Sequence, residues 1–348
     1  MDPFPDTPDA VTPRWLAGVL DRSVDEMTWQ PIGTGQVGDS ARFTFKSDGL
    51  PGSVVGKFPA ADPASRGTAA LVGLYAKEVA CYRHALPHLA VRAPAALHAA
   101  VSPDGGRFVL LLEDLGPARQ GDQLRGAALA DAEAAVRQAA AIHAPSRHAE
   151  WLDADWLRPP PGLREQLGRM YGHAHSVFAE RYAGALPAEA LALCAQLAPL
   201  MPSWFARNPA PECLIHGDYR LDNMLFDIRG GSEPIAVLDW QTVAAGRGMT
   251  DVGYLLGCGL GELGLAHQDH LLALYFDAMA ERGALLDRDT AMHDFRVGIL
   301  HGVSTAVFSA AFVERTERGD ANFLSMARGA CALALANDSL AALGKELA

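Results

Sequence analysis

Short apolar runs separated by turn residues fill the first third of the chain, and this pattern predicts a β-sheet. The expected strands are residues 29–33, 41–45, 54–58, 94–101 and 108–112. One helix is expected over residues 69–86, between the third and fourth strands. An earlier short helix is indicated by Thr12 and Pro13, which have the form of an N-cap and a first helical position.

The rest of the chain has mostly helical spacing of its apolar residues. The expected helices are residues 129–144, 163–182, 187–207, 267–282, 289–315 and 321–343. Residues 108–112, between the strand-rich and the helix-rich parts of the chain, are continuously apolar. They are followed by two acids and then Gly-Pro, which is typical of a strand that leaves its sheet as a linker. We therefore predict an α+β protein with an N-terminal lobe (1–112), a hinge (113–117) and a larger helical C-terminal lobe (118–348).

Composition narrows the classes of partner. The chain has 348 residues and a net charge of −12, with no lysine- or arginine-rich run, so nucleic acid and anionic membranes are poor candidates. The five cysteines are scattered without metal-ligand spacing and read as reduced, buried small hydrophobes. Neither a signal peptide nor a membrane-spanning run is indicated, so we expect a cytoplasmic protein without membrane insertion, as a monomer or homodimer.

The most informative stretch is the polar loop His216 to Asn223, which lies between two apolar pairs. Asp218 is followed five positions later by Asn223, and a second apolar strand ends in Asp239. Metal-assisted phosphoryl transfer needs a carboxylate to accept the proton of an attacking hydroxyl, and an amide oxygen and a second carboxylate to hold Mg²⁺. The sequence assigns these roles to Asp218, Asn223 and Asp239 respectively.

A lysine and a glutamate complete the constellation. Lys57 ends the third strand, and Glu78 lies on the helix that follows. A strand lysine paired with a helix glutamate holds the α- and β-phosphates in kinase-type sites. Each acid alone has a structural reading, as a turn cap or a strand end, but the ordered set favours chemistry. We expect Asp218, Asn223, Asp239 and Lys57 to share one magnesium-bound triphosphate.

Two further segments are candidates for nucleotide contact. The glycine-rich turn between the first two strands contains Gly35, Gln36 and Gly38, whose backbone N–H groups could approach phosphates. Backbone groups from Glu113 to Leu115 in the hinge could bind an adenine edge. The alternatives are an ordinary glycine hairpin and an ordinary linker.

The order of these motifs resembles the aminoglycoside phosphotransferase and choline-kinase-like superfamily, in particular its bacterial phosphotransferase and ecdysteroid-kinase-like branches. The resemblance runs from about Ile32 to about Leu256 and is most specific at His216 to Asn223 together with Leu238 to Gln241. It implies a two-lobed protein-kinase-like fold with an N-terminal antiparallel sheet and one main helix. It also implies transfer of the γ-phosphate of ATP, with GTP possible, to a hydroxyl of a small molecule.

Two alternatives remain beside a small-molecule kinase. A protein kinase is disfavoured because eleven residues separate Asp239 from Asp251, which leaves little room for an activation segment. A non-catalytic nucleotide-binding scaffold is disfavoured because the base, the metal ligands and the Lys–Glu pair are all present. The acceptor is open between a cationic aminoglycoside and an apolar hydroxylated metabolite; the apolar run 303–312 favours the latter, although helical apolar stripes are usually core.

Overall fold

The computed structural model describes residues 4–33, 38–207, 210–313 and 315–348. Contacts divide the chain into two compact units. The sheet unit comprises Met1–His88, Arg92–Ala118 and Asp227–Val243, and the helical unit comprises Leu89–Val91, Arg119–Phe226 and Ala244–Ala348. The division after Ala118 lies one residue beyond the hinge expected from the sequence, whereas residues 227–243, expected in the C-terminal lobe, group with the sheet.

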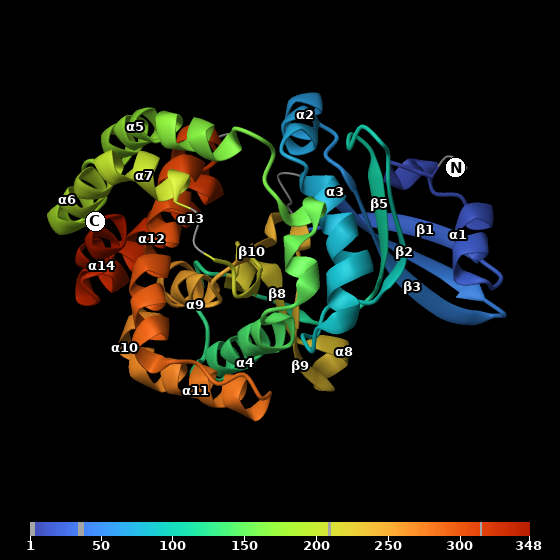
Figure 1. The fold of residues 1–348 in the computed structure, drawn as a ribbon. Coiled ribbons are helices and arrows are strands. Elements are labelled where there is room, and N and C mark those ends of the chain that lie inside the picture. Colours follow the sequence, from blue (N-terminus) through green and yellow to red (C-terminus); the bar gives the residue numbers. More distant parts are fainter. Residues whose placement is uncertain (1–3, 34–37, 208–209, 314) are drawn as a thin grey trace. The chain divides into compact units, whose positions relative to one another are not determined.

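The sheet unit is built on five antiparallel strands in the order β1-β2-β3-β5-β4 (Figure 1). Their bounds are β1 Asp25–Ile32, β2 Gly38–Ser47, β3 Leu50–Pro59, β4 Ala96–Val101 and β5 Phe108–Glu113. Each overlaps a predicted strand: β2 and β3 are longer than predicted, whereas β4 begins two residues later. In the pairing of β3 with β5, Lys57 lies opposite Leu110 and Gly56 lies opposite Leu111. Successive residues of a strand point to opposite faces of the sheet, so Lys57 and Gly56 lie on different faces.

Helices cover both faces of this sheet, which explains why β5 is apolar at each position from Phe108 to Leu112. On one face, Leu16 of α1 (Pro13–Leu20) joins a core with Phe43, Phe58 and Leu111. Thr12 caps α1 by accepting a hydrogen bond from the Trp15 N–H, as predicted. On the other face, the ring of Tyr75 from α3 (Leu74–Ala80) stacks on Phe108 at 4.4 Å between centroids.

The prediction of one continuous helix over residues 69–86 is wrong, because the helix is interrupted at Gly73. The chain forms α2 (Pro63–Leu71) and then α3, and the break lies at Gly73, which has a φ of 74°. This left-handed conformation suits glycine and ends the first helix. The consequence is that α3 takes its own direction, with Glu78 buried on the side of the sheet that carries Lys57.

Residues 227–243 add two short elements to the sheet unit, α8 (Ile228–Gly231) and β9 (Glu233–Val237). The Val237 N–H donates to the Arg92 carbonyl over 2.8 Å, and the Arg229 N–H donates to the Leu115 carbonyl over 2.9 Å. Arg92 also forms ion pairs with Glu113 and Glu233. These contacts fix the segment that ends in Asp239.

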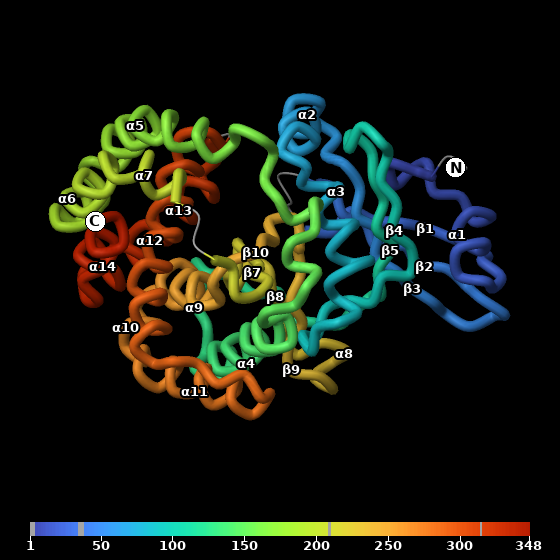
Figure 2. The backbone as a smooth tube through the Cα atoms, viewed as in Figure 1, coloured from blue at the N-terminus to red at the C-terminus, as the bar shows by residue number. Residues whose placement is uncertain are grey.

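The helical unit contains most of the helices (Figure 1). They are α4 Leu129–Ser146, α5 Leu163–Tyr182, α6 Ala188–Leu197, α7 Met201–Ala206, α9 Met249–Tyr254, α10 Glu262–Ala266, α11 Gln268–Glu281, α12 Arg288–Phe312, α13 Glu317–Ala336 and α14 Ser339–Leu347. Two predicted helices are divided: 187–207 breaks between α6 and α7, where Pro199 and Pro202 interrupt the backbone ladder, and 321–343 breaks at Asp338. The strands of this unit form two antiparallel pairings, β7 (Cys213–Ile215) with β10 (Ala244–Gly246) and β6 (Arg119–Gln120) with β8 (Met224–Asp227), and the tube in Figure 2 shows β7 beside β10.

Helix α12 lies at the centre of the helical unit and packs closely on α9. A Cβ at Gly298 would lie 2.8 Å from the Thr250 Cα, and one at Gly253 would lie 2.9 Å from the Ile299 N, so both glycines are needed for this approach. Among the described residues α12 is the one helix long and apolar enough to cross a membrane, and 61% of its apolar window is buried inside the protein. The five cysteines are all buried, as predicted.

Candidate active site

The loop between β7 and β8 carries Asp218 and is attached to three helices of the helical unit. The Tyr219 hydroxyl donates to the Ala135 carbonyl of α4 over 2.7 Å. His301 of α12 places its Nε2 2.9 Å from the Gly217 carbonyl. The third attachment is Asp251 of α9, which contacts the backbone itself. A loop held from three sides loses little further entropy when a substrate binds, which is what a catalytic group requires.

Asp251 binds the backbone of the loop directly. Its carboxylate accepts the N–H of His216 over 2.6 Å and the N–H of Gly217 over 2.9 Å. The His143 Nε2 lies 3.2 Å from the Asp251 carboxylate and its Nδ1 lies 2.9 Å from the Tyr275 hydroxyl, so both ring nitrogens of this buried histidine have partners. Burial alone would raise the pKa of Asp251, but His143 and the loop amides lower it below its usual range. Sequence reasoning missed this role, because Asp251 lies 35 residues after His216 and the contact is made only by folding.

The Asp218 carboxylate is held by three side chains. The Tyr254 hydroxyl donates to Oδ1 over 2.7 Å, and the Arg220 Nε forms an ion pair with the same oxygen at 3.0 Å. The Asn223 Nδ2 donates to Oδ2 over 2.9 Å. Sequence reasoning missed both Tyr254 and Arg220, because a tyrosine within an apolar helix reads as core and an arginine in a polar loop reads as solvated.

These partners keep Asp218 ionised despite its burial. Desolvation would raise the pKa of this carboxyl, but Arg220 and the Tyr254 hydroxyl outweigh it and the pKa falls below its usual range. The same contacts raise the pKa of the Arg220 guanidinium and, with burial, that of the Tyr254 phenol. Asp218 is therefore a carboxylate, and Arg220 a cation, at neutral pH.

Asn223 is oriented by the same network. Its Nδ2 donates both to the Asp218 carbonyl and to the Asp218 carboxylate, each over 2.9 Å. Since both bonds use the nitrogen, they fix which way the amide points. The Oδ1 atom has no hydrogen bond to any described residue, so an amide oxygen is left to act as a ligand.

Asp222 is the other acid of the loop. Its side chain is only 16% exposed and forms ion pairs with Arg220 and Arg318, each at 3.5 Å. Burial raises the pKa of this carboxyl. Asp222 therefore belongs to a charge cluster that positions Arg220 rather than to the solvent.

The sheet unit brings together the other predicted residues. Lys57 Nζ lies 2.8 Å from Glu78 Oε1 and 2.8 Å from Asp239 Oδ1, so the predicted strand–helix ion pair is present and a third residue joins it. Burial would lower the pKa of the lysine, but the two carboxylates more than reverse this, and Lys57 remains protonated. Asp239 has a φ of 64°, an uncommon left-handed conformation for a non-glycine residue that aims its side chain at Lys57.

The glycine-rich turn is described only in part. Gly35 and Gln36 lie outside the described residues. Gly38 begins β2 opposite Pro59, and a Cβ there would lie 2.9 Å from the Phe58 carbonyl and 3.6 Å from the Lys57 Cε. Glycine is thus required by the close approach of β2 to β3 beside Lys57, and its contact with phosphate stays a prediction.

In the hinge, the Glu113 side chain is engaged in ion pairs with Arg92 and Arg229. The Glu113 N–H donates to the Ala95 carbonyl, and the Leu115 carbonyl accepts from the Arg229 N–H. The Leu115 N–H has no hydrogen bond to another described residue, which leaves one backbone donor for a ligand. A role of either residue in nucleotide recognition stays a prediction.

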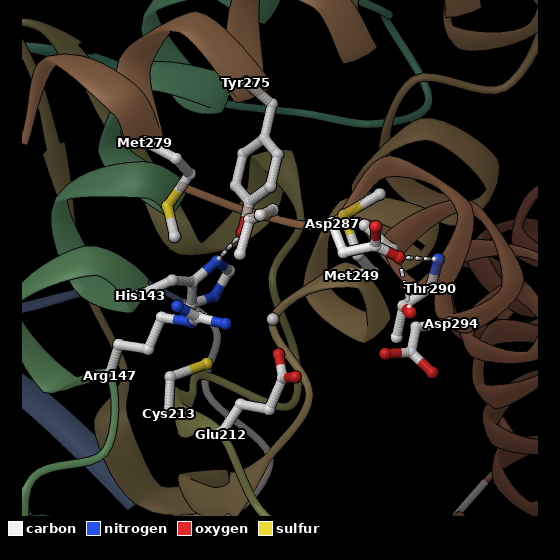
Figure 3. Close-up of a pocket in the computed structure, with 13 residues that line it drawn as sticks. His143, Arg147, Glu212, Cys213, Met249, Tyr275, Met279, Asp287, Thr290 and Asp294 are labelled. Atoms are coloured by element: carbon white, nitrogen blue, oxygen red, sulfur yellow. Dashed lines mark hydrogen bonds between the residues drawn. The ribbon is translucent and has the colours of Figure 1, made fainter. Parts of the chain in front are cut away.

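One small pocket lies in the helical unit, and none of the predicted site residues is among those that line it (Figure 3). It offers about 50 Å³ and is lined by residues that include His143, Glu212, Tyr275, Asp287 and Asp294. In Figure 3 the Tyr275 hydroxyl is hydrogen-bonded to the His143 ring, and the Asp287 carboxylate caps α12 by accepting the Thr290 N–H. This space suits a water molecule or two and is too small for a nucleotide.

The chain resembles known phosphotransferases in both sequence and fold. Residues 36–302 match the Phosphotransferase enzyme family. Spectinomycin phosphotransferase APH(9)-Ia, solved with ADP and spectinomycin, superposes with a TM-score of 0.55 at 13% identity, covering 96% of this chain and 100% of that one. The GDP complex of aminoglycoside 2'-phosphotransferase-IIIa superposes with a TM-score of 0.52 at 17% identity, covering 88% of this chain and 92% of that one.

Among curated proteins, the mouse acyl-CoA dehydrogenase family member 11 is 37% identical over 59 residues. That match spans 16% of this chain and 7% of the mouse protein. It is a local likeness, and the activity of the whole mouse protein does not transfer with it.

The fold is that of the superposed phosphotransferases. The chain belongs to the phosphotransferase enzyme family, since that match covers about three quarters of its length. The predicted α+β kinase-like fold and the predicted enzyme class are therefore confirmed.

Proposed function

We propose that the chain transfers the γ-phosphate of ATP to a hydroxyl group of a small molecule, with Asp218 as the base. The observation that carries this proposal is the Asp218 carboxylate, ionised although buried and fixed by Tyr254, Arg220 and Asn223. Its Oδ1 is occupied by Tyr254 and Arg220. Its Oδ2 accepts only from Asn223 among the described residues, so we assign Oδ2 as the atom that receives the acceptor's proton.

The chemistry of the donors fits magnesium. Among the described residues no cluster of three or more His, Cys, Asp or Glu side chains could hold a metal by itself. The candidate ligands, the Asn223 amide oxygen and the Asp239 carboxylate, are hard oxygen donors, and Mg²⁺ commonly takes one or two such groups plus phosphates and waters. When bound, the ion neutralises charge on the nucleotide phosphates.

The residues of this chain then act as follows. Lys57, kept cationic by Glu78 and Asp239, binds the α- and β-phosphates. Asp218 orients the acceptor hydroxyl, the acceptor oxygen bonds to the γ-phosphorus as the β–γ bridge breaks, and the proton passes late to Oδ2. Because the transition state of such transfers is loose, a carboxylate with a lowered pKa suffices, and positioning carries most of the effect.

The test compares Asp218 with an acid outside the loop. The wild-type chain, Asp218→Asn and Asp277→Asn, a variant of an exposed acid of α11, are incubated with ATP, Mg²⁺ and a panel of hydroxylated compounds, and phosphorylated product is read as a mass shift. We expect Asp218→Asn to lose about 10²–10⁴ in rate with unchanged ATP affinity, and Asp277→Asn to keep the wild-type rate. Normal turnover by Asp218→Asn would remove the residue from this role.

Two alternatives have distinct outcomes in the same assay. ATP or GTP binding without transfer to any acceptor would support a non-catalytic scaffold. Phosphorylation of kanamycin or spectinomycin would support an antibiotic-modifying kinase. Running each nucleotide in parallel decides between ATP and GTP as donor.

A further inference from the structure

Helix α12 presents one partly exposed face along its last three turns. His301, Thr305, Phe308 and Phe312 follow at spacings of four, three and four residues, which places them on one stripe of the helix. The opposite face is fully buried and consists of Val303, Ala306, Val307 and Ala310. Only one face of the apolar run 303–312 is therefore part of the hydrophobic core.

The stripe begins at the catalytic loop. The His301 Nε2 contacts the Gly217 carbonyl, one residue before Asp218. The His301 ring also lies 5.3 Å from the ring of Tyr254, whose hydroxyl bonds to Asp218. A molecule lying on this face would therefore have one end beside the proposed base.

The other end of the stripe is aromatic. The ring of Phe308 meets Tyr171 of α5 at 5.2 Å and Phe205 of α7 at 5.9 Å, and it stacks on Phe312 at 6.0 Å. Phe312 is 48% exposed, an uncommon position for so large an apolar ring. At 1.5 Å per residue, the stripe from His301 to Phe312 is about 16 Å long.

We propose that this stripe binds the apolar chain of the acceptor, and that the acceptor is an alcohol with an extended hydrocarbon portion. The inference rests on the proposed function, because it places the hydroxyl end of that molecule at Asp218. The stripe contains no carboxylate, so it offers no counter-charge to a cationic aminoglycoside. Its aromatic far end instead removes apolar surface from water when a hydrocarbon chain lies on it.

The experiment measures binding separately from catalysis. 1-Butanol, 1-hexanol and 1-octanol are titrated calorimetrically into the full chain without nucleotide. We expect the dissociation constant to fall roughly threefold to fourfold for each added methylene. Phe312→Ser should abolish this gain for octanol and leave butanol unchanged, Phe312→Leu should keep part of it, and the matched control Leu335→Ser, an exposed apolar residue of α13, should behave as wild type.

Three outcomes would overturn the proposal. They are dissociation constants that do not depend on chain length, equal effects of Phe312→Ser and Leu335→Ser, and a dimer that Phe312→Ser dissociates without any change in alcohol binding. Transfer of phosphate from ATP to octanol is then measured by mass. Chain-length-dependent binding without transfer would count against the proposed function alone, whereas transfer without chain-length dependence would count against the stripe alone.

Discussion

The phenolic oxygen of Tyr254 lies 2.7 Å from Oδ1 of Asp218, so a buried helix residue holds the carboxylate of the loop. Tyr254 is the last residue of α9, and α9 is positioned by its close packing on α12. The loop supplies the acid, and the helix supplies the group that orients it. The proposed chemistry thus depends on a residue 36 positions after Asp218.

We predict that Tyr254→Phe lowers kcat roughly tenfold, the equivalent of one lost hydrogen bond of about 1.4 kcal/mol. The nucleotide affinity should stay unchanged. Since the hydroxyl lowers the pKa of Asp218, its removal raises that pKa, and the acid limb of the pH–rate profile should move to higher pH. Steady-state kinetics across pH measure both effects. A merely structural role would lower stability without moving the limb.

Asp251→Asn should weaken both the fold and the reaction. The amide replaces one acceptor oxygen with a donor that faces the backbone N–H groups of His216 and Gly217. We expect the free energy of unfolding to fall by roughly 2–4 kcal/mol and kcat to fall with it. Urea unfolding measures the first, with the exposed Asp277→Asn of α11 as a control that should stay within about 0.5 kcal/mol.

The pH dependence of this effect has a definite sign. The pKa of Asp251 is lowered in the folded protein, so its stabilisation is complete above the unfolded pKa of about 3.9 and is lost as pH falls through the folded value. The difference in unfolding free energy between wild type and Asp251→Asn should therefore narrow at acid pH. A difference that stays constant down to pH 2 would argue against an ionised Asp251.

Lys57→Met leaves Glu78 buried without its cation. Side-chain exposure is 14% for Lys57 and 1% for Glu78, so solvent offers little compensation, and we expect a loss of about 3–5 kcal/mol in the free energy of unfolding. Lys57→Met combined with Glu78→Leu removes both charges and should recover much of that loss. Denaturant unfolding of the two variants compares them; equal destabilisation would contradict a mutually compensating pair.

Part of this architecture could be predicted from the sequence because it depends on residues that are close together in the chain. Short apolar runs between turn residues predicted the five strands, and the loop motif predicted Asp218 and Asn223 as candidate site residues. The break at Gly73 was missed because a helical pattern continues across it, although the glycine itself was the available signal. Tyr254, Arg220 and Asp251 were missed because their roles come from tertiary contacts, which residue type and spacing do not encode.

The lobe boundary illustrates the same limit. The strand ending in Asp239 follows the loop motif in the sequence and was assigned to the helical lobe. The structure instead ties residues 227–243 to the sheet unit through Arg92 and Leu115. Those backbone bonds join residues more than 100 positions apart, beyond what periodicity can indicate. That Asp239 and Asn223 bind the same metal ion remains a prediction of function.

The central claim is that Asp239 binds magnesium together with the nucleotide, and ATP titration with and without Mg²⁺ tests it most directly. Calorimetry on wild type, Asp239→Ala and the control Asp277→Ala gives the three dissociation constants in each condition. We predict that Mg²⁺ tightens ATP binding by the wild type and by Asp277→Ala, and leaves binding by Asp239→Ala unaffected. An equal tightening of all three proteins by Mg²⁺ would contradict the assignment.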